Sequence, residues 1–227
     1  MQKPERLILF DIDGTLLKTD GAGRRATRLA MEEVFGTASF LDQHNFSGKP
    51  DWQTLYELLK DDGYTVESIG EAMPTFEQAM GKHMSAIMPE HTTTVCTGAM
   101  ETVKSLRDDA RYLIGIVTGN TTASAKVKLI SGGFEPDWFP IGAFGSESID
   151  RNNLPPLALQ RAINYTQYDI QPHEVIIIGD TVMDITCARA LGAIAVAVTT
   201  GYTKREDLVA NNPDYLLDDL TGFSSIL

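Results

Sequence analysis

Short apolar runs recur along the chain, and most are separated by stretches in which apolar residues return at helical spacing. Strands buried in parallel sheets have this short, continuous apolar character, so the alternation predicts a parallel sheet wrapped by helices. Several runs end at a Gly, Asp or Thr, and ligands of open α/β sheets bind beyond the carboxyl ends of the strands. The predicted strands span residues 7–10, 113–117, 141–144, 175–178 and 193–198.

The alternation breaks between the first two predicted strands, where a long segment shows helical patterns and no strong strand. Those patterns lie at residues 24–35, 52–59 and 72–88. Four methionines at helical steps are predicted to pack inside this segment: Met73, Met80, Met84 and Met88. We therefore expect a helical insertion at residues 18–94, between the first predicted strand and the rest of the sheet.

The composition fits one α/β domain with an insertion, since the chain has 227 residues of which 43% are hydrophobic. Its 19 Lys and Arg against 31 Asp and Glu leave a net charge of −12, which disfavours binding to nucleic acids and anionic membranes. No apolar stretch approaches a membrane span, and no signal-peptide pattern is visible. Only Cys96 and Cys187 are present, which predicts no disulfide framework and a reduced, cytoplasmic setting.

Two carboxylates follow the first predicted strand, in the segment Asp11-Ile12-Asp13-Gly14-Thr15. Like charges this close raise each other's pKa unless a cation or hydrogen-bond donors offset the repulsion. Mg²⁺ favours carboxylate and carbonyl oxygens, so the pair indicates a magnesium site. The alternative is a polar turn after the strand, with Asp13 and Gly14 in a β-turn.

A second acidic pair follows the strand predicted at residues 175–178. If residues 181–191 are helical, Asp180 is the N-cap and Asp184 lies one turn later on the same side. Capping explains Asp180 alone. Two strands that both deliver carboxylates at their carboxyl ends indicate one shared cation.

Between these pairs, the strand at residues 113–117 leads into Thr118, Gly119 and Asn120 at the start of a predicted helix. A hydroxyl, a glycine that admits close approach and free backbone N–H groups together favour an anion site. Thr and Asn also cap helices for structural reasons, and the neighbouring strand ends strengthen the functional interpretation.

The order Asp11-x-Asp13-Gly-Thr15, Thr118 and Gly179-Asp180-x-x-x-Asp184, with an insertion after the first motif, resembles the haloacid dehalogenase superfamily of phosphatases. The resemblance covers nearly the whole chain and points to phosphoglycolate phosphatase-like members. It implies a Rossmann-like core formed by residues 1–17 and 95–227, with a helical cap inserted at residues 18–94. It implies that Asp11 is the nucleophile and that Asp13 is the general acid and base. Because Asp13 must hold a proton, we expect its side chain to lie further from the metal charge or Asp13 to bind the metal only through its backbone carbonyl. The resemblance also implies that Thr118 binds the phosphoryl group, that Asp180 binds the Mg²⁺ ion and that Asp184 binds it directly or supports one of its ligands. Thr15, Gly119 and Asn120 are candidate substrate contacts.

The chain departs from the family pattern in the third motif, where a Lys normally balances the charge of nucleophile and phosphate. No Lys occurs at residues 139–165, and the nearest cations are Arg151 and Arg161. Arg151 precedes a predicted helix start, where a merely structural cation would oppose the helix dipole. We expect Arg151 to replace the Lys and Arg161 to lie on a solvated helix face.

The cap segment Phe46-Ser47-Gly48-Lys49-Pro50-Asp51 resembles the loop that meets the substrate in related phosphatases. Lys49 could bind a carboxylate or phosphate of the leaving group, or the segment could simply be a turn before the helix at residues 52–59. Arg24 and Arg25 are weaker candidates, because basic residues on helices are usually solvated.

The sequence thus predicts a Mg²⁺-dependent phosphatase that acts on a small phosphorylated metabolite, as a monomer or homodimer. A phosphosugar mutase shares every core residue and stays an alternative. A haloacid dehalogenase has no use for Asp13, and a phosphonate hydrolase needs a Schiff-base lysine, for which only Lys49 is available in the cap loop.

Overall fold

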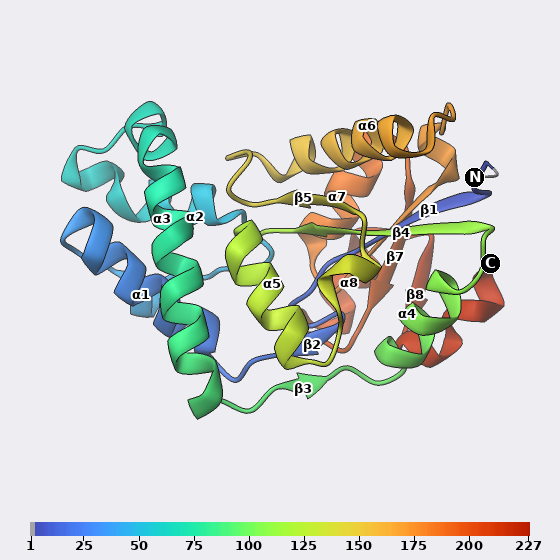
Figure 1. Cartoon of the computed structure of the whole chain (residues 1–227), viewed down its shortest axis with the longest axis horizontal. Coiled ribbons are helices and arrows are strands. Elements are labelled where there is room, and N and C mark those ends of the chain that lie inside the picture. Colours follow the sequence, from blue (N-terminus) through green and yellow to red (C-terminus); the bar gives the residue numbers. More distant parts are fainter. Residues whose placement is uncertain (1–2) are drawn as a thin grey trace.

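A six-stranded, entirely parallel sheet forms the centre of the molecule (Figure 1). The computed structural model describes residues 3–227. The strand order is β5-β4-β1-β6-β7-β8. The strands are β1 (Arg6–Phe10), β4 (Tyr112–Thr118), β5 (Ile141–Phe144), β6 (Val175–Gly179), β7 (Ile194–Val198) and β8 (Tyr215–Leu217).

All five strands predicted from the apolar runs are present, with ends that differ by no more than one residue. They are the buried strands of the sheet, and the apolar run in β1 is fully buried because it lies between two parallel neighbours. The sequence analysis missed β8, a three-residue edge strand whose side chains are half-buried or exposed. Its short, partly exposed pattern lacks the apolar continuity that marks the others.

Helices cover both faces of the sheet, and alternate residues of each strand point to opposite faces. In β1, Ile8 and Phe10 pack on one face, against α4 (Ala99–Arg107) and α5 (Thr122–Ser131). Leu7 and Leu9 pack on the other face, with α6 (Leu154–Thr166), α7 (Val182–Leu191) and α8 (Arg205–Ala210). The fold is therefore an α/β fold of the expected Rossmann-like kind.

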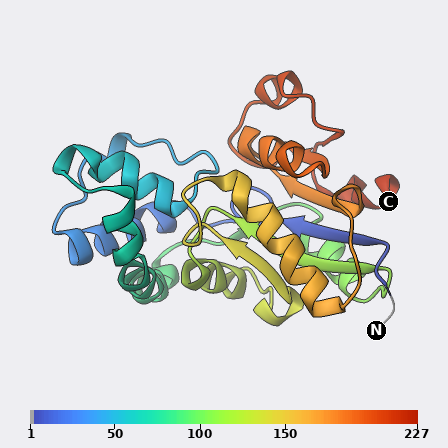
Figure 2. The ribbon, with the colours of Figure 1, turned by 90° about the horizontal axis from the view of Figure 1, so that it is seen from above.

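Three further helices lie to one side of the sheet and form a separate apolar cluster (Figures 1 and 2). They are α1 (Ala22–Phe35), α2 (Asp51–Leu59) and α3 (Val66–Ile87). The four methionines predicted to pack here are buried in this cluster. Helix α3 begins six residues earlier than predicted, because Thr65 and Ser68 form a capping box at its start.

A two-stranded antiparallel ribbon of β2 (Leu17–Lys18) and β3 (Thr94–Val95) joins these helices to the sheet. The domain division predicted at residues 18–94 falls within this ribbon and stays a prediction. Short 3₁₀ helices complete the fold: η1 (Leu41–Gln43), η2 (Lys60–Asp62), η3 (Met88–Glu90), η4 (Pro136–Trp138), η5 (Arg151–Asn153), η6 (Pro172–Glu174) and η7 (Leu220–Ile226).

The start of α2 is attached directly to the loops that follow β4 and β5. The Asp51 backbone N–H donates to the Gly119 carbonyl at 2.7 Å, and the Trp52 N–H donates to the Gly145 carbonyl at 3.1 Å. The Asp51 carboxylate accepts from the Thr121 N–H at 2.8 Å. The helices α1, α2 and α3, which we call the cap helices, therefore lie over the carboxyl ends of the central strands. Within the described residues, no helix combines the length and apolarity needed to cross a membrane.

Candidate active site

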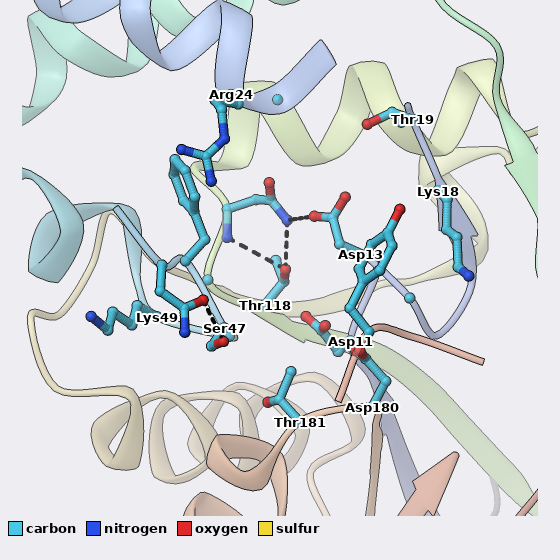
Figure 3. A pocket seen from close by; sticks show the side chains of 18 of the residues that line it. Asp11, Asp13, Lys18, Thr19, Arg24, Ser47, Lys49, Thr118, Asp180 and Thr181 are labelled. Atoms are coloured by element: carbon cyan, nitrogen blue, oxygen red, sulfur yellow. Dashed lines mark hydrogen bonds between the residues drawn. The ribbon is translucent and has the colours of Figure 1, made fainter. Parts of the chain in front are cut away.

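The carboxyl ends of β1, β4 and β6 meet below a cavity of about 630 Å³ that the cap helices cover from above (Figure 3). Asp11 follows β1, Thr118 ends β4 and Asp180 follows β6, so three strands deliver polar side chains to one place. Parallel strands end at the same edge of their sheet, which explains how distant segments converge. This edge brings together the motifs predicted from the sequence.

Three buried carboxylates form an acidic cluster at the bottom of this cavity. Asp11, Asp180 and Asp184 each offer an oxygen, and these oxygens lie within 4.8 Å of one another. The pKa of Asp11 is raised to about 7, mainly by burial, which Arg151 opposes and the neighbouring Asp184 reinforces. Burial, together with Asp11 and Asp184, also raises the pKa of Asp180 well above its usual range. Such a cluster is costly unless a cation offsets the repulsion.

The cluster fits a hard divalent cation such as Mg²⁺. Its donors are all carboxylate oxygens, the ligands that Mg²⁺ prefers. Oδ1 of Asp180 is buried and has no hydrogen-bond partner among the described residues. A buried carboxylate oxygen without a partner is expensive, and a metal ion would satisfy it.

Two glycines make room for the Asp180 carboxylate. A Cβ atom at Gly201 would lie 1.6 Å from Oδ2 of Asp180, and one at Gly14 would lie 2.6 Å from its Cγ. Gly14 also has a φ of +82°, which disfavours any side chain there. Gly14 of the first motif therefore makes room for Asp180, which follows the neighbouring strand β6.

Thr181, not Asp180, is the N-cap of α7, so the predicted capping role was wrong. The Asp184 carboxylate accepts from the Thr181 N–H at 3.0 Å and from its hydroxyl at 2.6 Å, which forms a capping box. The sequence analysis placed the helix one residue early and left Asp184 unexplained by capping. Since Thr181 caps the helix, Asp180 remains free to join the acidic cluster.

Arg151 lies within this site, in the short helix η5 before α6, and is 1% exposed. Its Nη2 lies 3.3 Å from Oδ1 of Asp11 and also donates to Asp184. Its Nη1 donates to the Gly48 carbonyl of the cap. One guanidinium therefore contacts Asp11 of the first acidic pair, Asp184 of the second acidic pair and Gly48 of the cap loop.

Arg161 lies away from the cluster, on a helix face open to solvent as expected, with 39% of its side chain exposed. It donates to the Gly142 carbonyl at 2.6 Å and forms an ion pair with Glu147 at 2.6 Å. These contacts form because α6 packs along β5 and brings this residue next to the loop that follows the strand.

The side chain of Asp13 lines the same cavity but is not one of the three carboxylates of the acidic cluster. Its Oδ2 accepts from Asn120 Nδ2 at 2.7 Å and from Lys128 Nζ at 2.6 Å (Figure 3 draws the first bond). Asn120 Nδ2 also donates to the Thr118 hydroxyl at 2.8 Å. The predicted metal contact of Asp13 through its backbone carbonyl stays a prediction.

Lys128 is a site residue that the sequence analysis missed. It belongs to α5, is 4% exposed, and its ammonium group reaches the cavity. The available signal was its spacing, since Lys128 falls four residues after the buried Ser124 and next to the buried Leu129. A charged residue on the buried face of a helix calls for a partner, and here the partner is Asp13.

The remaining anion-site residues are buried around the nucleophile candidate. Thr15 and Thr118 are fully buried, and the Thr15 hydroxyl has no hydrogen-bond partner among the described residues. A glycine at position 119 was expected because it admits the close approach of an anion, but the structure shows another reason for it. A Cβ atom there would lie 2.3 Å from the Lys49 carbonyl, so this glycine admits the cap backbone.

The cap contributes two basic side chains to the region. Lys49 forms an ion pair with Glu57 at 2.5 Å and points away from Asp11 in Figure 3. Arg24 lines the cavity, donates to the His44 carbonyl at 2.9 Å and lies 4.6 Å from the Phe46 ring centroid. Arg24 was expected to be a weaker candidate than Lys49, but its contacts with Leu41, His44 and Phe46, in the segment after α1, turn it into the cavity.

Both cysteines are buried, which agrees with the sequence analysis, in which neither looks activated. Burial raises the pKa of Cys187 to about 12, so a thiolate is disfavoured there. The chemistry of the cavity therefore rests on carboxylates, hydroxyls and cations.

Comparison with known proteins agrees with this geometry. The model of the haloacid dehalogenase-like hydrolase family matches residues 8–198. This chain belongs to that family. It is 26% identical over 240 residues to a phosphoglycolate phosphatase of Vibrio vulnificus (strain CMCP6), which covers 100% of this chain and 97% of the relative. The sequence expectation of a hydrolase of the phosphatase type is confirmed.

Two further proteins broaden the comparison. The chain is 26% identical over 222 residues to the pyrophosphatase PpaX of Bacillus mycoides (strain KBAB4), covering 97% of this chain and 95% of the relative. The solved structure of CbbY from Rhodobacter sphaeroides, in complex with phosphate, has a TM-score of 0.72 and 18% identity, covering 95% of this chain and 94% of that one. The structural likeness confirms the fold.

Proposed function

We propose that this phosphatase is Mg²⁺-dependent and hydrolyses a small phosphate monoester through a phosphoaspartyl intermediate on Asp11. The observation that supports it best is the position of Asp11, at the bottom of the cavity between Arg151 and the acidic cluster. A carboxylate so placed can attack phosphorus in line while a fixed cation faces the phosphoryl oxygens. Asp11 attacks only when ionised, and Arg151 favours that state.

Asp11, Asp180 and Asp184 would hold the metal ion, with the backbone carbonyl of Asp13 as a further ligand. When bound, Mg²⁺ would neutralise charge on the carboxylates and on the phosphoryl oxygens. Arg151, Thr118 and the backbone N–H groups at residues 119–120 would bind the phosphoryl group. Arg151 thereby replaces the Lys that the family pattern has in the third motif.

Asp13 would transfer the protons. Its carboxylate lines the cavity beside Asp11 and is 44% exposed, so a leaving group can reach it. In the first step the leaving oxygen takes a proton from Asp13 as the P–O bond breaks. In the second step Asp13 takes a proton from the water that attacks the phosphoaspartate.

The substrate we propose is a small anionic monoester. The cap covers the cavity and leaves about 630 Å³, which suits a metabolite rather than a macromolecule. A contact between Lys49 and the leaving group is less favoured, because the ammonium group of Lys49 is paired with Glu57. The same ion pair weakens the alternative of a phosphonate hydrolase, which needs a free lysine amine. We further propose a cytoplasmic location and a monomer or homodimer.

The test is a panel of phosphate esters assayed with Mg²⁺ for release of inorganic phosphate, including phosphoglycolate, pyrophosphate and hexose 1-phosphates. We expect phosphate release from at least one small monoester, and none from the Asp11→Asn variant, while the exposed Asp62→Asn variant on the cap keeps its activity. Acid-quenched enzyme should contain a peptide with Asp11 phosphorylated.

The mutase and dehalogenase alternatives each have their own outcome, in the same panel and in a companion assay with a 2-haloacid. A hexose 1-phosphate converted to an isomer without phosphate release would establish a mutase. Halide release from a 2-haloacid without added metal would establish a dehalogenase, and either result would overturn the proposal.

A further inference from the structure

Lys128 is a buried cation that the reaction described above does not use. Its ammonium group lies 2.6 Å from Oδ2 of Asp13 and 2.6 Å from Oδ1 of Asn120. Gly23 of the cap helix α1 leaves space for it, because a Cβ atom there would lie only 3.2 Å from Nζ. Ordering a long, charged side chain in the interior is costly in entropy and desolvation. This cost suggests that Lys128 has a role at the site in addition to packing.

The hydrogen bonds of Lys128 determine the orientation of Asn120. Since Nζ can only donate, the amide atom facing it must be the oxygen Oδ1. The Asn120 amide N–H₂ then faces Asp13 and the Thr118 hydroxyl, to which it donates at 2.7 and 2.8 Å. Lys128 thus acts on Asp13 twice, directly and through Asn120.

Both donors contact the same oxygen of Asp13. Oδ2 accepts from Lys128 and from Asn120, whereas Oδ1 has no donor among residues 3–227. A carboxylic acid whose carbonyl oxygen accepts two N–H bonds carries its proton on the other oxygen. The network therefore distinguishes two oxygens that would otherwise be equivalent.

We propose that Lys128 is a positioning residue for Asp13, which with Asn120 holds Oδ2 so that Oδ1 is the oxygen that transfers protons. In the first step the proton on Oδ1 passes to the leaving oxygen as its bond to phosphorus breaks, and Asp13 becomes a carboxylate. In the second step Oδ1 accepts a proton from the attacking water, which restores the acid. This inference rests on the proposed role of Asp13.

The experiment measures single-turnover phosphoryl transfer from an alkyl phosphate and from p-nitrophenyl phosphate. The alkoxide needs a proton to leave, whereas the nitrophenolate leaves with little help. In Lys128→Met we expect a loss of about 10- to 10²-fold on the alkyl ester and several-fold less on the aryl ester, since general acids contribute about 10²–10⁴-fold. Lys126→Met, on the exposed side of the same helix, should stay within about twofold of wild type on both esters.

A double-mutant cycle with Asp13→Asn separates positioning from packing. If Lys128 acts through Asp13, Lys128→Met should cause no further loss in the Asp13→Asn background, because residues that act as a unit are not additive. Equal losses on both esters, or an undiminished loss in the Asp13→Asn background, would overturn the inference. Thermal unfolding of each variant checks folding, and Lys128→Gln replaces Lys128→Met if the latter does not fold.

The same measurements distinguish this inference from the proposed function. A large leaving-group-dependent loss in Asp13→Asn with none in Lys128→Met would refute the positioning role alone. No such loss in Asp13→Asn would refute the acid role of Asp13, and the role of Lys128 with it.

Discussion

Nη2 of Arg151 lies 3.3 Å from Oδ1 of Asp11, and both side chains are buried. Burial raises the pKa of Asp11, and the nearby guanidinium opposes that shift. The same nitrogen donates to Asp184, while Nη1 donates to the Gly48 carbonyl of the cap. Arg151 therefore links the charge state of the proposed nucleophile to the cap loop.

We predict that Arg151→Met loses far more activity than Arg161→Met. Arg151 faces Asp11, whereas Arg161 bonds to Gly142 and Glu147 outside the acidic cluster. Removing a charge that stabilises a transferring phosphoryl group costs on the order of 10² in rate or more. Steady-state kcat/KM of both variants on one monoester is the measurement. Similar, small losses in both would contradict the site role of Arg151.

We predict that chelation abolishes activity and that added Mg²⁺ restores it. The clustered carboxylates of Asp11, Asp180 and Asp184 have only Arg151 as a cation in ion-pair contact within residues 3–227. Calorimetric titration of Mg²⁺ into the protein should show one site, which Asp180→Asn weakens and the exposed Asp62→Asn does not. Full turnover in excess chelator would refute the metal assignment.

Gly201→Ala should weaken Mg²⁺ binding without preventing folding. A Cβ atom at residue 201 would lie 1.6 Å from Oδ2 of Asp180, so this carboxylate must move. Changes beside metal ligands typically cost about 10- to 100-fold in affinity. The matched control is Gly222→Ala, where the nearest atom lies 3.9 Å away. Equal Mg²⁺ affinity in wild type and Gly201→Ala would contradict the role of Asp180 as a ligand.

Asp51→Asn should gain stability relative to wild type as the pH rises. Burial raises the pKa of Asp51 to about 6 in the folded protein, so the folded state holds a proton that the unfolded state releases near pH 4. Wild type therefore loses free energy of unfolding as the pH rises through this window, by up to about 3 kcal/mol. Asparagine avoids this loss, and its oxygen can still accept from the Thr121 N–H.

Urea unfolding of wild type and Asp51→Asn at pH 4, 5, 6 and 7 measures this difference. The exposed Asp62→Asn variant should show a flat difference over the same range. We expect the free energy of unfolding of Asp51→Asn to rise relative to that of wild type as the pH rises. If it falls instead, the surroundings of Asp51 favour its carboxylate form, and the prediction is wrong.

The sequence by itself determined the sheet and the principal motifs. Buried strands need continuous apolar runs, so five of the six sheet strands were visible, and polar residues at their ends identified Asp11, Thr118 and Asp180 as neighbours. The absence of a Lys at residues 139–165 left Arg151 and Arg161 as candidates, and the position of Arg151 before a predicted helix favoured the residue that lies beside Asp11. These inferences succeed because strand burial and strand-end position are set by local sequence and a known sheet topology.

Tertiary structure alone decided which side chains meet across elements. Lys128 reaches Asp13 from a helix 115 residues later, and Gly201 makes room for Asp180 from the loop after β7. Such pairings depend on packing between distant segments, and the local pattern of one segment contains no information about the side chains that pack against it.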